Sequence, residues 1–288
     1  MVSASALYRE AVKELKTARI ESAKFEAGEL ISYFSGLSKS DILLEKQCED
    51  DAAEKIRRSV TERIKGRPLQ YILGEWEFCG REILCREGVL IPREDTETLV
   101  RCVACEMEKR YTPGSKIDIL DLCCGSGCVG LGLWHLLKDF KVNVVSADVS
   151  EEAINLTEDN AVLWKASSNF KVIKADVLAG TPVNGLFDVI VSNPPYIKTD
   201  VMNDLQPEVL NFEPHIALDG GHDGLDFYRE IACHYVKNLK DEGILAVEIG
   251  FDEREKVTNI LKDAGFAEIS SVDDLNGNNR VVYGIKIS

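Results

Sequence analysis

The chain has 288 residues, of which 45% are hydrophobic and 29% charged, so it can bury a sizeable core and is neither disordered nor collagen-like. Its 34 Lys and Arg residues against 49 Asp and Glu residues leave a formal net charge of −15. Because so acidic a surface repels a phosphate backbone, a free-standing DNA-binding module is disfavoured and no direct nucleic-acid binding is expected.

Residues 1–75 show the periodicity of amphipathic helices and almost none of the alternation typical of strands. Leu7, Ala11 and Leu15 recur at helical spacing, and a later apolar stripe ends at Gly66 and Pro68, which together terminate a helix. The first 20 residues lack the uninterrupted apolar stretch of a secretory signal. We therefore predict a small helical domain and do not expect export.

Residues 76–92 alternate loosely around Gly80 and Gly88, which predicts a short β-hairpin linking two parts of the chain. From residue 93 to residue 288, strand-like and helix-like segments alternate, and the last two strands flank Asn276-Gly277. One of the expected helices runs from about Leu225 to Leu239. This pattern predicts an α/β, Rossmann-like fold, with a parallel sheet covered on both faces and an antiparallel hairpin at its edge. Ligands of such sheets bind beyond the carboxyl ends of the strands.

The nine cysteines are an odd number scattered along the chain, which favours a reducing cytoplasm over a disulfide framework. Cys102 and Cys105 lie within a helical pattern and have no further metal ligand at suitable spacing, so a buried helix face is expected. The apolar window at 119–137 is interrupted by charge and glycine, and no membrane span is expected. We expect a monomer without a metal site.

The segment DLCCGSGCVGL joins the first strand of this sheet to a helix, a geometry that cradles a nucleotide. Gly125, Gly127 and Gly130 also have the spacing of the dinucleotide fingerprint, so a nicotinamide dehydrogenase stays an alternative. Asp148, at the end of the second strand, is placed to accept hydrogen bonds from ribose hydroxyls. A carboxylate at Asp121, close to the loop, disfavours a pyrophosphate and favours a cationic ligand such as S-adenosylmethionine.

The tetrapeptide Asn193-Pro194-Pro195-Tyr196 directly follows the buried strand FDVIVS and is the most specific signal in the chain. Two prolines make the loop stiff and rich in acceptors. The Asn193 side-chain oxygen and the Pro194 carbonyl can each accept one N–H of an amide or aromatic amine, while Tyr196 can pack against its face. Such contacts would localise the nitrogen lone pair and aim it at a methyl group.

With these residues the chain resembles the release-factor glutamine methyltransferase family, of the HemK or PrmC type, which methylates the side-chain amide of a glutamine in peptide chain release factors. The resemblance covers nearly the whole chain and includes GRPLQYILGEWEF, LIPREDTETLV, DLCCGSGCVGL, SADVS, SNPPYI and FEPHIALDGGHDGLDFYREI. It implies a class I S-adenosylmethionine-dependent methyltransferase fold for residues 93–288. It also implies that residues 1–75 recognise the release factor and that the methylated glutamine belongs to a Gly-Gly-Gln motif.

Carried over by position, the resemblance implies these cofactor-binding residues: Cys123, Cys124, Gly125, Ser126, Gly127, Asp148, Val177 and Asn193. It makes Asn193, Pro194, Pro195 and Tyr196 the catalytic tetrapeptide. Cys123 stands where the family usually has glycine, Glu94 where proline is common and Val177 where some members have an aromatic ring. We predict a negative φ at Cys123, because it is an L-residue.

Four residues near these motifs have open or structural interpretations. Arg93 and Glu97 either border the cofactor site or cap the helix that starts near residue 95. His215 and His222 are expected to be structural or solvated, because methyl transfer to an amide needs no histidine base.

Two alternative substrates remain. The sequence distinguishes a ribosomal-protein glutamine methyltransferase only weakly from one that acts on release factors. A DNA or RNA adenine N6-methyltransferase would use the same amine-holding loop on an extruded base, but would be expected to carry a basic recognition region.

Overall fold

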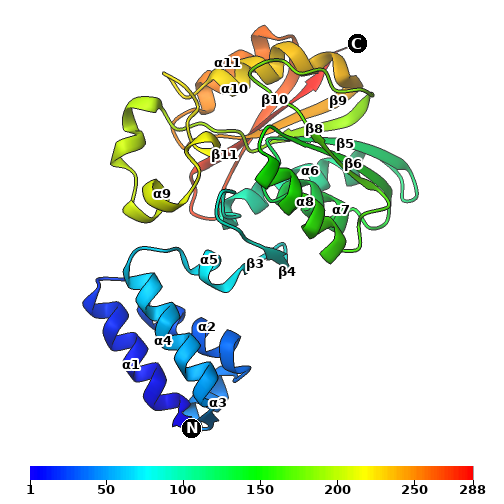
Figure 1. Ribbon diagram of the computed structural model, residues 1–288. Coiled ribbons are helices and arrows are strands. Elements are labelled where there is room, and N and C mark those ends of the chain that lie inside the picture. The colour runs from blue at the N-terminus through cyan, green and yellow to red at the C-terminus, as the bar shows by residue number, and fades with distance from the viewer. Residues whose placement is uncertain (288) are drawn as a thin grey trace. The chain divides into compact units, whose positions relative to one another are not determined.

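The computed structural model describes residues 1–287, and the chain divides into two units (Figure 1). The first unit comprises residues 1–75 and 207–212, and the second comprises the rest of the described chain. The second stretch of the first unit, residues 207–212, therefore comes from the middle of the sequence that otherwise builds the second.

The first unit is helical, which confirms the expected character of the amino-terminal region. Its elements are β1 (Val2–Ser3), α1 (Ala4–Thr17), α2 (Ala23–Ser35), α3 (Lys39–Leu43), β2 (Gln47–Cys48), α4 (Asp50–Ile64), α5 (Leu69–Leu73) and α9 (Pro207–Phe212). Helix α1 begins where the Ser3 side chain caps the Ala6 N–H, and it buries Leu7 and Leu15. Helix α4 ends just before Gly66, whose φ is +98°.

A buried ion-pair network joins three helices of this unit. The Arg63 Nε on α4 lies 2.7 Å from Glu26 Oε2 on α2, and its Nη2 lies 2.8 Å from Glu208 Oε2 on α9. Arg63 is only 9% exposed, so each carboxylate offsets part of the cost of burying its charge. The network anchors the 207–212 stretch to the helices at the start of the chain.

A tight hairpin lies at the start of the second unit, as predicted, but its strands end at Leu84, short of the expected 76–92. Strands β3 (Glu75–Phe78) and β4 (Arg81–Leu84) form a two-stranded sheet. Cys79 and Gly80 turn the chain with φ of +52° and +73°, as a two-residue hairpin turn with left-handed backbone requires. The Asn160 side chain holds β4 through its Oδ1, which accepts from the Leu84 N–H at 2.8 Å.

The main sheet has seven strands in the order β10-β11-β9-β8-β5-β6-β7. Their bounds are β5 (Lys116–Leu122), β6 (Lys141–Asp148), β7 (Phe170–Lys174), β8 (Phe187–Ser192), β9 (Leu239–Glu248), β10 (Phe266–Asp273) and β11 (Asn279–Lys286). Strand β11 pairs antiparallel with β9 and β10, whereas β9, β8, β5, β6 and β7 are parallel. The predicted α/β fold with an antiparallel edge is confirmed.

Helices cover both faces of this sheet (Figure 1). Residues of α6 (Glu97–Arg110), α7 (Cys128–Leu136) and α8 (Glu151–Leu163) pack into one buried apolar cluster, and residues of α10 (Asp226–Glu230) and α11 (Arg254–Asp263) into another. The single helix expected over 225–239 is wrong in detail. After α10 the chain takes a π-helical turn over Ile231–Tyr235 and a 3-10 turn over Val236–Asn238. Strand β9 then begins at Leu239, where the expected helix was to end.

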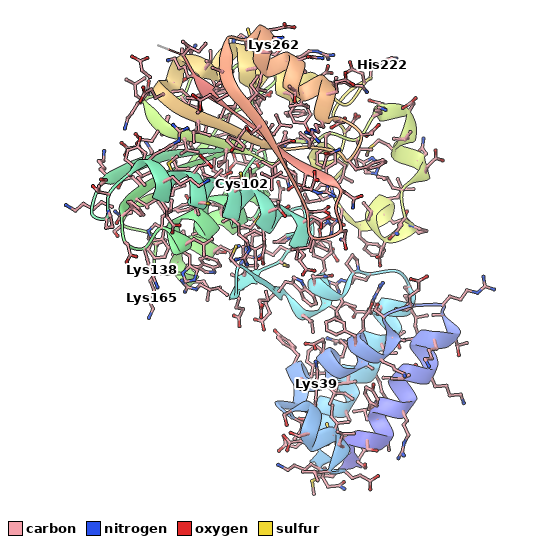
Figure 2. All side chains as sticks on the ribbon, turned by 180° about the vertical axis from the view of Figure 1, so that it is seen from behind. Lys39, Cys102, Lys138, Lys165, His222 and Lys262 are labelled. Atoms are coloured by element: carbon pink, nitrogen blue, oxygen red, sulfur yellow. The ribbon has the colours of Figure 1, made fainter. Side chains whose placement is uncertain are left out.

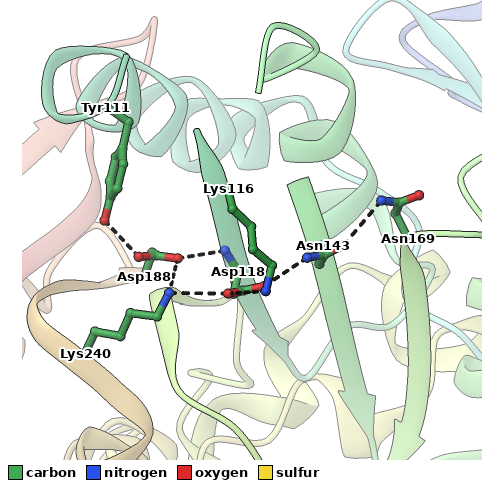
Figure 3. Close-up of polar contacts among 7 residues, drawn as sticks. All are labelled: Tyr111, Lys116, Asp118, Asn143, Asn169, Asp188 and Lys240. Atoms are coloured by element: carbon green, nitrogen blue, oxygen red, sulfur yellow. Dashed lines mark hydrogen bonds and ion pairs between the residues drawn. The ribbon is translucent and has the colours of Figure 1, made fainter. Parts of the chain in front are cut away.

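A polar cluster ties the amino ends of the central strands together (Figure 3). Asp188 on β8 accepts hydrogen bonds from the Tyr111 hydroxyl at 2.8 Å, the Asp118 N–H at 2.8 Å and the Lys240 ammonium at 2.7 Å. Asp118 on β5 in turn accepts from the Asn143 side chain on β6 at 3.0 Å. Because these groups hydrogen-bond to one another, the cluster has a structural role.

The surface carries most of the charge. Lys138, Lys165 and Lys262 are exposed at the edges of the second unit (Figure 2). On α6, Cys102 packs against the core but Cys105 is exposed, so the expectation of a buried helix face holds only for Cys102.

Candidate active site

A cavity of about 190 Å³ lies at the carboxyl ends of the parallel strands, within the second unit. Its walls come from the loops that follow β5, β6, β7 and β8, together with residues 88–93 and part of the 214–217 loop. Eight of the eleven predicted site residues line it: Cys123, Cys124, Gly125, Ser126, Asp148, Val177, Asn193 and Pro195. Gly127, Pro194 and Tyr196 do not line it.

The loop after β5 winds tightly into α7. Cys123, Gly125 and Gly127 all have left-handed backbone, with φ of +56°, +56° and +78°. The Cys124 N–H donates to the Ala147 carbonyl at 3.1 Å, and the Gly127 N–H donates to the Cys124 carbonyl at 2.7 Å. These bonds fix a turn that exposes backbone to the cavity and starts the helix at Cys128.

The prediction of a negative φ at Cys123 is wrong. The turn requires left-handed backbone at this position, and a cysteine adopts it at a cost of about 1–2 kcal/mol. Gly127 also differs from expectation, because it faces α8 instead of the cavity. A Cβ there would lie 2.7 Å from Thr157 Cγ2, so its glycine allows the loop and α8 to pack closely.

Asp148 presents a carboxylate to the cavity from the end of β6. Its Oδ2 accepts from the Gly125 N–H at 2.9 Å and its Oδ1 accepts from the Ser150 N–H at 3.0 Å. Burial raises the pKa of Asp148, while these backbone hydrogen bonds oppose that shift. The remaining lone pairs suit hydroxyl donors. Val177, which is 4% exposed, forms an apolar wall after β7.

Asp121 does not line the cavity, contrary to its expected place near the ligand. It lies beneath the first turns of α7, where its Oδ2 accepts from the Gly130 N–H at 3.1 Å and the Ser146 hydroxyl at 3.2 Å. Its Oδ1 is buried without a hydrogen-bond partner among the described residues. Burial raises the pKa of Asp121 to about 7. The carboxylates that line the cavity are Asp148 and Asp176.

The Asn193 side chain is held from one side. Its Nδ2 donates to the Thr96 hydroxyl at 3.1 Å. The amide oxygen, on the other branch of the side chain, therefore faces away from Thr96. Tyr196 packs against the core instead of the cavity, and its hydroxyl donates to Glu248 Oε1 at 3.4 Å. Burial raises the pKa of Tyr196. Tyr196 is thus an anchor of the tetrapeptide loop in this structure.

A second loop supports the tetrapeptide from behind. The Ile197 N–H donates to the Leu218 carbonyl at 2.9 Å, and the Gly220 N–H donates to the Ile197 carbonyl at 2.8 Å. A Cβ on Gly220 would lie 2.6 Å from the Tyr196 Cα, and one on Gly224 would lie 2.5 Å from the Tyr196 carbonyl oxygen. The two glycines therefore let this loop press directly on the tetrapeptide backbone.

Arg93 and Glu97, whose roles the sequence leaves open, have different partners in the structure. Arg93 lines the cavity and forms an ion pair with Glu213, which is 5% exposed and also accepts from the Ile91 N–H at 3.3 Å. Glu97 instead accepts from the Cys79 N–H at 2.7 Å and pairs with Arg101 at 2.6 Å, so it braces the hairpin.

Sequence reasoning missed Thr96, Glu213 and Glu248. Their only sequence signal is their place in the segments IPREDTE, FEP and AVEIG, each beside a strand end or a helix start. His222 lies at the surface (Figure 2). Within residues 1–287, no group of three or more His, Cys, Asp or Glu side chains is arranged to hold a metal ion. None of the helices in that range is both long and apolar enough to cross a bilayer.

Two family models match the chain: the PrmC N-terminal domain over residues 6–74, and the methyltransferase small domain over residues 96–211. Release factor glutamine methyltransferase from Fusobacterium nucleatum is 41% identical over 244 residues, covering 84% of this chain and 67% of the relative. The enzyme of the same name from Agrobacterium fabrum is 36% identical over 272 residues, covering 94% and 93%.

Two solved structures resemble the chain at the level of the fold. A methyltransferase from Pyrococcus furiosus has a TM-score of 0.51 at 17% identity, covering 72% of this chain and 89% of that one. The hMettl16 catalytic domain, solved with a MAT2A 3′UTR hairpin, has a TM-score of 0.55 at 15% identity, covering 83% of each chain. Both show a likeness of fold alone.

Proposed function

The chain belongs to the release factor glutamine methyltransferase family, and we propose how its own residues carry out the methylation. The enzyme methylates a glutamine side chain of a peptide chain release factor. We assign the target to the Gly-Gly-Gln motif and the methyl donor to S-adenosylmethionine. The observation that carries this proposal is the acceptor-rich Asn193 loop beside a cavity built to hold a nucleoside.

The residues around the cavity fit S-adenosylmethionine. Asp148 is a half-buried carboxylate with capacity left for ribose hydroxyls, and Val177 offers an apolar surface to an adenine ring. The backbone of Cys124, Gly125 and Ser126 would follow the methionine part. When bound, the cofactor supplies an electrophilic methyl group next to a positive sulfonium. The two cavity-lining carboxylates suit that positive charge.

Asn193 and Pro194 would bind the target amide. An amide nitrogen is a poor nucleophile, because its lone pair is delocalised into the carbonyl group. The Asn193 Oδ1 and the Pro194 carbonyl would each accept one N–H and hold the nitrogen with its lone pair toward the methyl group. Pro195 stiffens the loop and Tyr196 anchors it to Glu248. The proton released after transfer would leave to water.

We assign release-factor recognition to the helical domain of residues 1–75, for which the match of a separate domain model over 6–74 gives support. We also propose that the enzyme acts in the cytoplasm as a monomer. The free thiols at all nine cysteines suit a reducing compartment.

The test is a labelled-methyl assay on the full-length enzyme with S-adenosylmethionine and three substrates: a release factor, ribosomal proteins and duplex DNA. We expect label in the release factor, and none when the Gly-Gly-Gln glutamine is replaced by alanine. Label in DNA or ribosomal protein but not in the release factor would overturn the proposal. Asn193→Ala should lose most of kcat while cofactor affinity stays the same, because its acceptor matters most as the amide reorganises.

A further inference from the structure

Two buried polar side chains lie next to the tetrapeptide loop: Thr96, which lines the cavity, and Glu248, which does not. Thr96, in the 3-10 turn Glu94–Thr96 that precedes α6, is 1% exposed and accepts the Asn193 Nδ2–H at 3.1 Å. Thr96 also lowers the pKa of Glu248 as a hydrogen-bond donor to its carboxylate, which stands at the end of β9 and is likewise 1% exposed. The Tyr196 hydroxyl reaches the same carboxylate at 3.4 Å. Glu248 is thus linked to both ends of the tetrapeptide loop. It contacts Tyr196 directly, and it is linked to Asn193 through Thr96.

The direction of these hydrogen bonds follows from the number of protons available. A threonine hydroxyl has one proton to donate and two lone pairs that accept. An ionised carboxylate only accepts, so it takes the Thr96 proton. Thr96 can then only accept from Asn193, which requires Nδ2 to face Thr96 and Oδ1 to face away from it. The charge on Glu248 therefore sets which branch of the Asn193 amide is presented.

We propose that Glu248 and Thr96 are positioning residues that keep the Asn193 oxygen turned toward the target amide. This inference rests on the proposed role of Asn193 as an acceptor. Glu248 does not line the cavity, whereas Thr96 lines it next to Asn193. Thr96 would act on Asn193 directly, and Glu248 would act on it through Thr96.

Protonation of Glu248 would undo this arrangement. A neutral carboxyl group can donate to Thr96, and the Thr96 proton is then free to turn toward Asn193 and favour the flipped amide. Burial raises the pKa of Glu248 to about 7, and its Oε2 is buried without a partner among the described residues. Ionisable groups face it from each neighbouring element: Asp95 before α6, Cys128 on α7, Tyr196 after β8, Tyr228 on α10 and Arg280 on β11.

Of these groups, Arg280 is the cation, and Asp274 and Asp95 neutralise much of its charge at 3.0 and 3.1 Å. The ionised form of Glu248 therefore dominates only above the raised pKa. It follows that kcat should fall as the pH drops through about 7.

The first experiment compares Thr96→Val with Thr96→Ser in the full-length enzyme. Valine has the same shape without the hydroxyl, whereas serine keeps it. We expect Thr96→Val to lower kcat by about 10- to 100-fold, with unchanged cofactor affinity by calorimetry, and Thr96→Ser to restore most of it. A folded Thr96→Val enzyme with wild-type kcat would overturn the proposal, as would a serine variant no better than valine.

The second experiment measures kcat from pH 5.5 to 8.5 for the wild type and Glu248→Gln. Glutamine fills the same space but does not titrate, so the acid limb near pH 7 should be absent from the variant. An identical acid limb in both enzymes would overturn the role of Glu248. The two proposals fail on different results. The proposed function is refuted if the wild type does not methylate the release factor, or if Asn193→Ala keeps full kcat. If Asn193→Ala loses kcat but the Thr96 and Glu248 variants keep it, only the positioning role is refuted.

Discussion

Replacing Gly220 with alanine should displace the catalytic loop without touching the cavity. The φ of Gly220 lies outside the left-handed region, so alanine meets no backbone strain there and the effect is steric. Its Cβ would lie 2.6 Å from the Tyr196 Cα and 2.8 Å from the Pro195 carbonyl oxygen. Because carbon atoms in contact normally lie about 3.5–4.0 Å apart, the two backbones must separate by roughly 1 Å.

A shift of about 1 Å in a group that aligns the reacting atoms costs about 100-fold in rate, or about 2.7 kcal/mol of activation free energy. We therefore expect Gly220→Ala to lower kcat for release-factor methylation about 100-fold. Cofactor affinity should change little, because Asp148 and the loop after β5 are not displaced. The assay is steady-state methylation with calorimetry of cofactor binding on the same preparation.

The matched control is Gly28→Ala on α2, where an added Cβ meets no atom within 4 Å. It should keep full activity and gain about 0.5–1 kcal/mol in stability, since alanine is the better helix former. Our reasoning fails if Gly220→Ala is folded, as judged by its melting temperature, and retains kcat within about twofold of the wild type.

Three further predictions concern the cofactor loop and its surroundings. Asp148→Ala should weaken cofactor binding by about 10- to 100-fold in calorimetry, since a charge-assisted hydrogen bond is worth about 1.5–3 kcal/mol; an unchanged Kd would remove Asp148 from the site. At Cys123, glycine should be more stable than alanine by about 1 kcal/mol in urea unfolding, because only alanine keeps the strain of a positive φ; equal stability would contradict that strain. Because the pKa of Asp121 is raised from 3.8 to about 7 on folding, its contribution to stability is lost as the pH rises across that range. Asp121→Asn should flatten the pH dependence of the unfolding free energy by up to about 1.4 kcal/mol per pH unit, whereas an unchanged slope between pH 5 and pH 7 would refute the shift.

The order of helices and strands was predictable because buried strands and amphipathic helices leave different hydrophobic periods. The place of the tetrapeptide followed from the same pattern, since Asn193 comes directly after a fully buried strand. The π-helical turn over Ile231–Tyr235 leaves no such period, and apolar residues continue through it. Its irregular hydrogen bonding is set by packing against the sheet, which the sequence alone does not describe.

Within the candidate site, local residues were predictable and their distant partners were not. Thr96 meets Asn193 across 97 positions in sequence, a contact that depends on the fold of the whole sheet. The prediction of a negative φ at Cys123 failed for a different reason. Residue type favours a negative φ, but the turn between β5 and α7 overrides that preference.

The helical unit is discontinuous in sequence, and this has a consequence for synthesis. Helices α1, α2 and α4 can assemble as soon as they leave the ribosome, but α9 is made only after most of the second unit has been translated. At ordinary rates of elongation that delay is on the order of 10 s. During this delay, Arg63 can form its ion pair with Glu26 but not the one with Glu208. The first unit to emerge is thus among the last to be completed, and a nascent chain stalled before residue 207 should hold it in a less stable form.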